Sequence, residues 1–331
     1  MDKISNLKNI MIIGTGGTIA GVGETGKTAS YDTGQINIEN LTAGISHIHE
    51  LANLSMRDVL SVDSCDITRK DWVNLANSIN EMAKSDEIDG FVITHGTDTL
   101  EETAYFLNLT VKTNKPVVIT GSMRPATATS PDGPFNLYQA VALAKSDEAV
   151  GKGVLVVFSD GIYGARDIQK VNTYKTDAFN QRDLGSLGFM RDDKVYFYNA
   201  SLKKHTVDSE FDVSNIEELP NVGVVYFYAD ADVRMLEYAM EVSDGLVIAG
   251  AGCGGSSIIW NDKIRKAVES GYPVVRSSRI LNGLVTGEDL TVEDKGVCAN
   301  TLSPQKARIL LSLALTKTKD IKEIKNIFEI Y

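Results

Sequence analysis

Short apolar runs alternate with longer amphipathic stretches along most of this chain. In the first half, runs typical of buried strands lie at residues 9–14, 90–94, 116–120 and 153–158. Helix-like stretches lie between them at residues 69–84, 100–109 and 135–144. An alternation of strands and helices is typical of a parallel sheet with helices on both faces. The pattern therefore predicts a doubly wound α/β domain.

The same alternation returns after a polar stretch. Residues 199–220 are polar and charged without a clear period, which is typical of a connector between domains. Beyond them, strands are expected at 223–228, 246–249 and 273–277, and helices at 233–241 and 258–269. The end is helical, with Ser303 as a candidate N-cap before Pro304. We expect a larger N-terminal α/β domain with a mostly parallel sheet (1–198), a linker (199–220) and a smaller C-terminal α/β domain (221–331).

Composition narrows the class of protein. The 331 residues are 43% apolar and 23% charged, as in soluble globular proteins. The net charge of −11 argues against a nucleic-acid or polybasic membrane surface, because either needs clustered Lys and Arg. No apolar run is long enough to cross a bilayer. Residues 1–6 lack the apolar core of a signal peptide, which favours the cytoplasm; removal of a leader would point instead to a periplasmic or secreted protein.

Cysteine and histidine positions do not suggest a metal site. Cys65, Cys253 and Cys298 are far apart, odd in number and without a Cys-x-x-Cys pair, so neither a zinc site nor a disulfide framework is indicated. His47 and His49 have no obvious third ligand, and such pairs are more often surface residues. We expect an enzyme without metal or cofactor.

Two loops with side chains suited to catalysis follow predicted strands, where the active sites of parallel α/β sheets lie. Residues 14–21 read Gly-Thr-Gly-Gly-Thr-Ile-Ala-Gly, which is either a tight turn with locally bonded hydroxyls or a ligand-lining loop. Residues 94–102 read Thr-His-Gly-Thr-Asp-Thr-Leu-Glu-Glu. Asp98 and Glu101 are spaced as in a capping box, so Thr97 or Asp98 could simply cap a helix. The same groups could bind an ammonium group and activate water.

A lysine and a glycine-rich segment need separate interpretation. Lys170 follows the strand at 153–158, and a lysine buried beside a hydroxyl can have a lowered pKa and accept a proton; a lone lysine is more often a solvated surface residue. Residues 21–28 match the phosphate-loop pattern G-x-x-x-x-G-K-[ST]. No strand directly precedes them and turn formers follow, so we interpret them as a flexible loop and not a nucleotide site.

These pieces, in this order, resemble the bacterial-type L-asparaginase family, particularly its type II and glutaminase-asparaginase branch, over nearly the whole chain. The resemblance assigns catalytic roles to Thr18, Thr97, Asp98, Lys170 and, in a mobile lid, Tyr31. It implies substrate binding by Ser64 at the α-carboxylate, by Asp98, and by Glu288 donated from a neighbouring subunit. It also implies a homotetramer, built as a dimer of dimers with shared active sites.

The implied reaction has two steps. Thr18, helped by Tyr31, attacks the side-chain amide of L-asparagine and releases ammonia, leaving an acyl-enzyme. Lys170 and Thr97 then serve the proton transfers while water hydrolyses the ester. The sequence alone does not decide which threonine attacks first.

Two positions depart from the family pattern. Cys65 stands where the family commonly has a glutamine that contacts the substrate's α-amino group. Residues 252–255 read Gly-Cys-Gly-Gly where the family often has Gly-Asn-Gly-Asn. Each lost polar contact weakens binding by about 1–3 kcal/mol. We therefore expect an amidohydrolase with weaker affinity or an altered ω-amide preference; the alternatives are a glutaminase-asparaginase and a weakly catalytic protein that binds or senses amino acids.

Overall fold

The structure is a computed structural model that describes residues 7–17, 19, 21–27, 31–32, 42, 44–287 and 296–331. The chain divides into two compact units, Met1–Asn215 and Ile216–Tyr331, and each is described by itself. The boundary between the units falls inside the stretch 199–220. Among the described residues, no helix combines the length and apolar character that spanning a membrane requires.

In the described part of the first unit, eight strands form one sheet in the order β12-β11-β8-β7-β6-β5-β1-β4. Their bounds are β1 (Asn9–Gly16), β4 (Asn53–Val62), β5 (Gly90–Thr94), β6 (Val117–Thr120), β7 (Val154–Phe158), β8 (Gly161–Gly164), β11 (Gly188–Arg191) and β12 (Lys194–Phe197). The strands from β7 to β4 run parallel, and β8, β11 and β12 extend the sheet antiparallel. The predicted mostly parallel sheet is confirmed.

The strand β4 was not predicted, and its place in the sheet explains why. It is an edge strand, paired only with β1 in the described sheet. Its residues are exposed or half-buried throughout. An edge strand of this kind lacks the continuous apolar run that marks a strand buried on both faces.

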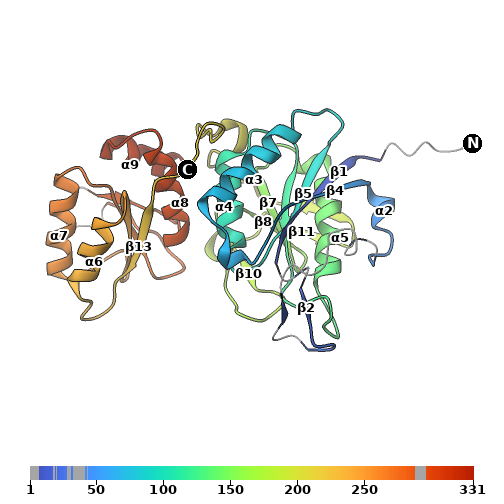
Figure 1. The fold of residues 1–331 in the computed structure, drawn as a ribbon, viewed down its shortest axis with the longest axis horizontal. Coiled ribbons are helices and arrows are strands. Elements are labelled where there is room, and N and C mark those ends of the chain that lie inside the picture. The colour runs from blue at the N-terminus through green and yellow to red at the C-terminus, as the bar shows by residue number, and fades with distance from the viewer. Residues whose placement is uncertain are drawn as a thin grey trace, which may run out of the picture. The chain divides into compact units, whose positions relative to one another are not determined.

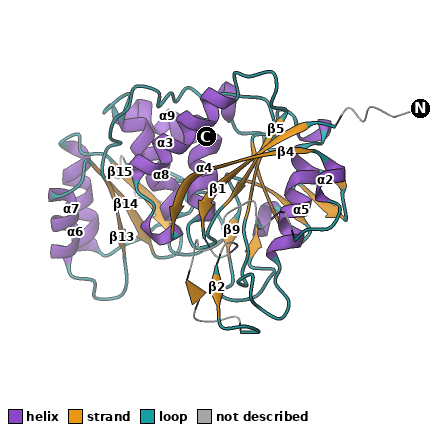
Figure 2. Cartoon of the chain, turned by 45° about the vertical axis from the view of Figure 1, so that its right-hand side comes forward, coloured by secondary structure: helices purple, strands orange, loops and turns teal. Residues whose placement is uncertain are grey.

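Helices cover both faces of the sheet (Figures 1 and 2). One face carries α3 (Arg69–Met82) and α4 (Leu100–Thr110), and the other carries α5 (Gly133–Ala144) with the short α2 (Ile48–Leu51). The helix α3 begins at a capping box, in which the Thr68 hydroxyl and the Asp71 carboxylate each bond the other residue's backbone N–H.

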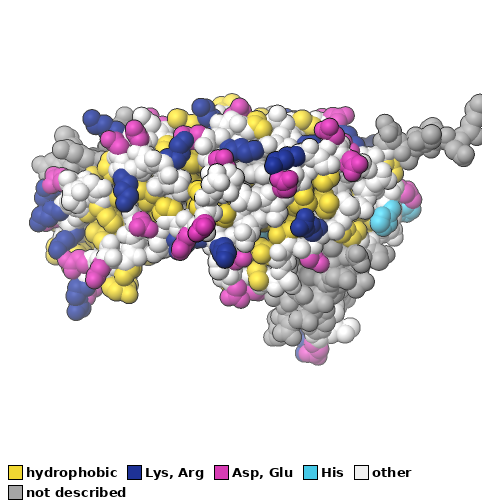
Figure 3. All heavy atoms as spheres, turned by 45° about the horizontal axis from the view of Figure 1, so that its top comes forward, with side chains coloured by type: hydrophobic (Ala, Val, Ile, Leu, Met, Phe, Trp, Pro, Cys, Tyr) yellow, Lys and Arg dark blue, Asp and Glu magenta, His cyan; other side chains and the backbone are white. Residues whose placement is uncertain are grey.

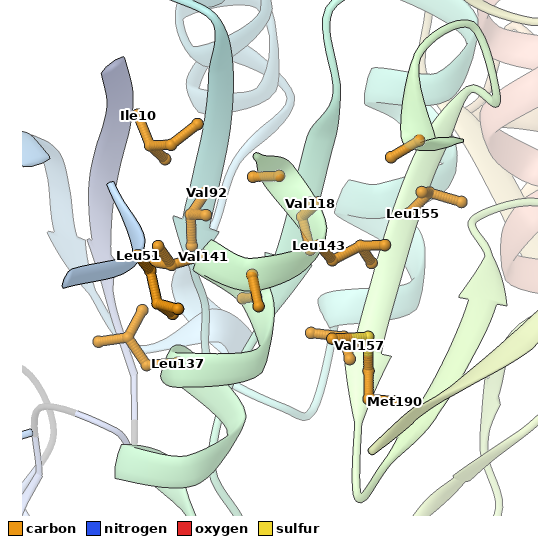
Figure 4. Packing of buried hydrophobic residues seen from close by; sticks show 14 of the residues in the cluster. Ile10, Leu51, Val92, Val118, Leu137, Val141, Leu143, Leu155, Val157 and Met190 are labelled. Atoms are coloured by element: carbon orange, nitrogen blue, oxygen red, sulfur yellow. The ribbon is translucent and has the colours of Figure 1, made fainter. Parts of the chain in front are cut away.

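The core under α5 is built from the inward side chains of neighbouring strands (Figure 4). Ile10, Val92 and Val118 lie on β1, β5 and β6, and they belong to one buried cluster with Leu137 and Val141 of α5. Burial of each such side chain stabilises the fold by about 1.5–3 kcal/mol. The sheet is therefore a rigid platform for the loops at its carboxyl edge.

The order of the parallel strands places a switch point beside β1. The chain passes from β1 to β4 on one side, and then to β5 on the other side of β1. At such a point the loops after the two central strands diverge, and ligands bind outside the carboxyl ends. The loops after β1 and β5 are those with the predicted chemistry.

Two small antiparallel ribbons accompany the main sheet. One pairs β2 (Val22–Gly23) with β3 (Tyr31–Asp32), and the other pairs β9 (Gln169–Lys170) with β10 (Phe179–Asn180). A phosphate loop requires a helix directly after its lysine. Here residues 22–23 of the phosphate-loop pattern instead form β2, which pairs with β3.

The end of the first unit is packed although its sequence is polar. Phe211 and Val213 are buried. The Ser209 hydroxyl donates to the carbonyl of Leu109 at 2.5 Å, and the Asn77 amide donates to the carbonyl of Val213 at 3.3 Å. This part of the stretch 199–220 is therefore fixed against α3 and α4.

The second unit has a smaller parallel sheet in the order β13-β14-β15-β16. Its strands are β13 (Val222–Tyr226), β14 (Gly245–Gly250), β15 (Val274–Ser278) and β16 (Val297–Cys298). Its helices are α6 (Val233–Glu241), α7 (Ile258–Glu269), α8 (Pro304–Leu315) and α9 (Ile321–Ile330). Ser303 occupies the N-cap of α8 as predicted, but its side chain makes no capping bond.

Candidate active site

Three loops meet at the carboxyl edge of the first sheet because two glycines let their backbones touch. A Cβ atom on Gly17 would lie 2.4 Å from the backbone nitrogen of Gly96, and Gly17 has a φ of +86°. A Cβ atom on Gly96 would lie 2.8 Å from Oγ of Ser64. Only glycine fits either position. The loops that follow β1, β4 and β5 are thereby held against one another.

The lysine on β9 joins this cluster from a distant part of the chain. Nζ of Lys170 donates to Oγ1 of Thr97 at 2.9 Å and to Oδ1 of Asp98 at 2.5 Å. The Thr97 and Lys170 side chains are largely buried, whereas the Asp98 side chain is 60% exposed. A hydroxyl in contact with an amine beside an accessible carboxylate can exchange a proton and bind a cation.

Cys65 contacts the other oxygen of the same carboxylate. Its Sγ lies 3.7 Å from Oδ2 of Asp98. Burial, together with the carboxylates of Asp98 and Asp63, raises the pKa of the Cys65 thiol. The thiol therefore stays protonated at neutral pH and donates to Asp98. Ser64 is buried next to it, and its carbonyl accepts a hydrogen bond from the Thr99 hydroxyl at 2.7 Å.

The capping-box interpretation of this loop is wrong. The helix α4 has Thr99 at its N-cap, and no side chain makes the capping bond. Thr97 and Asp98 bond Lys170 instead. The Glu101 carboxylate accepts a hydrogen bond from the backbone N–H of Lys170. The local spacing was right for a cap, but the approach of β9 gives these side chains a partner outside the helix.

His95 and Thr15 hold the loop backbones. Nδ1 of His95 donates to the carbonyl of Gly96 at 2.7 Å, and complete burial lowers the pKa of His95 to about 4. The Thr15 hydroxyl donates to the carbonyl of Thr94 at 2.9 Å. The Thr15 hydroxyl therefore bonds backbone, but that of the neighbouring strand β5, 79 residues away, and not the local backbone of its own turn.

Three predicted site residues are not described by the structure. Thr18, Glu288 and the Tyr31 side chain lie outside the described residues. The structure brings together Ser64, Cys65, Thr97, Asp98 and Lys170. Across the described ranges, no group of three or more His, Cys, Asp or Glu side chains is arranged to hold a metal ion.

Sequence reasoning missed the roles of Glu101 and Thr99. Glu101 was noted only as the partner of a cap. In α4, every residue except Glu102 is buried, so a carboxylate sits within an otherwise enclosed helix. The sequence does not mark Glu101 for this role, because the next residue, Glu102, is also acidic and acidic residues are ordinary in the first turn of a helix.

The surface carries both signs of charge. On the face shown in Figure 3, Lys and Arg side chains are interspersed with Asp and Glu side chains, without a continuous basic patch. Nucleic-acid surfaces need such a patch.

The chain is similar to known proteins over nearly its whole length. Residues 9–203 match the family model described as Asparaginase, N-terminal, and residues 221–328 match the one described as Glutaminase/Asparaginase C-terminal domain. The L-asparaginase 2 of Bacillus subtilis is 46% identical over 98% of this chain and 87% of its own length. The glutaminase-asparaginase of Pseudomonas fluorescens is 42% identical over 98% of this chain and 91% of its own length.

A solved structure has the same fold. The crystal structure of a probable cytoplasmic L-asparaginase from Campylobacter jejuni matches with a TM-score of 0.93 at 44% identity, covering 98% of this chain and 100% of that one. The predicted fold class, with a larger N-terminal α/β domain and a smaller C-terminal one, is confirmed.

Proposed function

The chain belongs to the asparaginase family, and from this premise we propose that it hydrolyses the side-chain amide of L-asparagine to L-aspartate and ammonia through a threonine ester. The observation that carries the proposal is the contact of Lys170 Nζ with both Thr97 Oγ1 and Asp98 Oδ1. Proton transfer to and from the reacting groups needs titratable side chains within hydrogen-bond reach of one another. A purely binding protein has no need of this arrangement.

In the proposed first step, Oγ of Thr18 bonds to the amide carbon of the substrate. Its proton passes to the leaving nitrogen with the help of Tyr31, and ammonia departs as the carbon–nitrogen bond breaks. Thr18 directly follows Gly17, whose backbone touches Gly96 in the loop that carries Thr97. This neighbourhood supports two threonines acting on one substrate.

In the proposed second step, water attacks the ester. Lys170 and Thr97 relay the proton of the attacking water to Oγ of Thr18, which leaves as the ester bond breaks and L-aspartate forms. The hydrogen bond from Nζ of Lys170 to the Asp98 carboxylate holds the lysine beside Oγ1 of Thr97 during this transfer. No metal or cofactor takes part in this scheme.

Substrate recognition follows from the accessible carboxylate. We assign the substrate ammonium to Asp98, assisted by Glu288 of a neighbouring subunit, and the α-carboxylate to Ser64. Cys65 borders the same subsite through its contact with Asp98. Because a relative of similar identity is named glutaminase-asparaginase, hydrolysis of L-glutamine is the second candidate activity.

The proposed assembly is a homotetramer with shared active sites. Large apolar side chains are exposed on neighbouring helices of the second unit: Met235 and Tyr238 on α6, and Ile258 and Ile259 on α7, with Ile258 87% exposed. Clusters of this kind usually mark an interaction surface. A second copy of the chain is the partner that the proposed sharing of sites requires.

A cytoplasmic location completes the proposal. It agrees with the name of the Campylobacter protein, whereas a Haemophilus influenzae relative, 44% identical, is named a probable periplasmic L-asparaginase. Cell fractionation followed by immunoblotting tests this assignment, with the enzyme expected in the cytoplasmic fraction and not in the osmotic-shock fluid.

Ammonia release tests the activity itself. The purified protein is incubated with L-asparagine, L-glutamine and their D-forms, beside a Thr18→Ala variant. Turnover of L-asparagine that is abolished in Thr18→Ala is expected. A folded protein that turns over none of the four, yet binds L-aspartate tightly, would be an amino-acid sensor instead.

A further inference from the structure

Lys170 lies on a strand that is not part of the main sheet. The strand β9 pairs only with β10 in the described structure, and this ribbon is separate from the eight-stranded sheet. The ribbon is bonded internally where the N–H of Val171 donates to the carbonyl of Ala178 at 2.7 Å. Successive N–H groups of a strand point to opposite sides. The N–H of Lys170 accordingly points away from β10.

That outward N–H bonds to the side chain of Glu101. It donates to Oε2 of the carboxylate. Glu101 lies in the first turn of α4, directly after the loop that carries Thr97 and Asp98, and is 5% exposed. The Glu101 carboxylate therefore bonds the backbone of Lys170 to α4. The loop just before α4 carries Thr97 and Asp98, which Nζ of Lys170 bonds.

The position of Glu101 in the fold suits a buried negative charge. A carboxylate shielded from water is costly unless hydrogen bonds satisfy it. The first turn of a helix favours a negative charge because the free N–H groups of the helix lie there. A side chain that ended in a methyl group at this position would leave the N–H of Lys170 without this acceptor.

We propose that Glu101 is the positioning residue for Lys170. It holds the backbone of Lys170 so that Nζ reaches Oγ1 of Thr97 and Oδ1 of Asp98 together, and it acts without touching the substrate. The expected effect of Glu101 on the reaction rate rests on the proposed function. The expected effect of Glu101 on the position of Lys170 does not. Misplacement of a catalytic group by about 1 Å can lower a rate by about 100-fold.

Kinetics of three variants test the proposal. Glu101→Ala removes the acceptor, Glu101→Gln keeps an oxygen acceptor without the charge, and Thr103→Val is the matched control. Thr103 lies on the same helix, is buried, and accepts a hydrogen bond from Nε1 of Trp72 at 2.8 Å, so its loss affects stability away from β9.

We expect Glu101→Ala to lower kcat for L-asparagine at least about tenfold while KM changes less than about threefold. Glu101→Gln should recover kcat to within about threefold of the wild type, since it can still accept the bond. Thr103→Val should lower the melting temperature and keep the wild-type kcat. Wild-type kcat in Glu101→Ala, or equal losses in Glu101→Ala and Glu101→Gln, would overturn the proposal.

A double-mutant cycle separates positioning from general damage. If Glu101 acts through Lys170, Glu101→Ala should change kcat less than about twofold in a Lys170→Ala background. A full tenfold loss in that background would show a separate role. If Glu101→Ala does not fold, Glu101→Asp is tested in its place, because the shorter side chain moves the acceptor back by one methylene. An unchanged kcat in Glu101→Asp would also contradict the proposal.

Hydrogen exchange supplies a readout that needs no turnover. The amide of Lys170 should exchange at least about tenfold faster in Glu101→Ala than in the wild type, and not in Thr103→Val. Residue-resolved mass spectrometry measures this. If the wild type fails to hydrolyse L-asparagine, the proposed function fails, yet the exchange result still decides whether Glu101 holds Lys170. Unchanged exchange at Lys170 would overturn the inference.

Discussion

Sγ of Cys65 lies 3.7 Å from Oδ2 of Asp98, on the oxygen opposite the one to which Lys170 donates at 2.5 Å. The carboxylate that we propose for the substrate ammonium thus already has a donor on each oxygen. A protonated thiol there competes with an incoming ammonium group. The cysteine at position 65 therefore bears directly on binding at the substrate site that we propose.

Replacing Cys65 with glutamine should strengthen binding of L-asparagine. The change removes the competing thiol and adds an amide oxygen that can accept from the substrate ammonium. A contact of about 1 kcal/mol corresponds to a rise in kcat/KM of about fivefold. Steady-state kinetics measure the change, with Cys65→Ala separating loss of the thiol from gain of the amide. An unchanged kcat/KM in Cys65→Gln contradicts the prediction.

The Cys65 thiol should be slow to alkylate. Burial and the carboxylates of Asp98 and Asp63 raise its pKa, so a smaller fraction is thiolate at any pH near neutrality. Iodoacetamide labelling followed by peptide mass spectrometry should show slower reaction at Cys65 than at Cys253, although both residues are exposed. Asp98→Asn removes a raising charge and should speed labelling at Cys65. Equal rates in the wild type and Asp98→Asn would refute this account.

Removal of the Thr97 hydroxyl should abolish efficient turnover. Thr97→Val keeps the shape of the side chain and removes the oxygen that Lys170 bonds at 2.9 Å. Loss of a proton-transfer partner typically costs about 100-fold to 10,000-fold in rate. The control is Thr110→Val, since the Thr110 hydroxyl is buried and donates to the carbonyl of Phe106 within its own helix, α4. A comparable loss of kcat in both variants argues for general damage.

Acid should destabilise the protein partly through His95. Its pKa in the folded state is about 4, below the ordinary value of 6.5. Between these values the unfolded chain binds more protons, so the free energy of unfolding falls as pH drops from about 6.5 towards 4. The full effect is about 3 kcal/mol. His95→Asn removes this titration, so its melting temperature should fall less between pH 7 and pH 4.5; an equal fall would exclude His95 as the cause.

Charges on α7 should break the proposed assembly. Ile258→Glu combined with Ile259→Lys places charges in the exposed apolar cluster of the second unit, where burial between copies would strongly disfavour them. Light scattering after size-exclusion chromatography should show a smaller species than the wild type. Leu202→Glu is the control, because Leu202 is 99% exposed on the first unit. A wild-type mass for the double variant would place the interface elsewhere.

Much of the fold could be predicted because its elements are marked locally. The bounds of β5, α6 and α7 agree with the prediction to the residue. Each is identified by its own hydrophobic period and its flanking polar residues. The edge strand β4 and the antiparallel strands β8, β11 and β12 were not predicted, because strands that are short or only partly buried lack a clear hydrophobic pattern.

The sequence by itself determined the α/β architecture, the family and the loops that carry chemistry, since these depend on local periods and on motifs that are contiguous in the chain. Only the tertiary structure decided the partners of the side chains. Local rules allowed Thr97 or Asp98 to cap α4, and Glu101 to close a capping box. These side chains bond Lys170 instead, because β9 packs beside the loop and places Lys170 next to Asp98, 72 residues earlier in the sequence. A side chain bonds the group that packing places beside it, and packing depends on the whole chain.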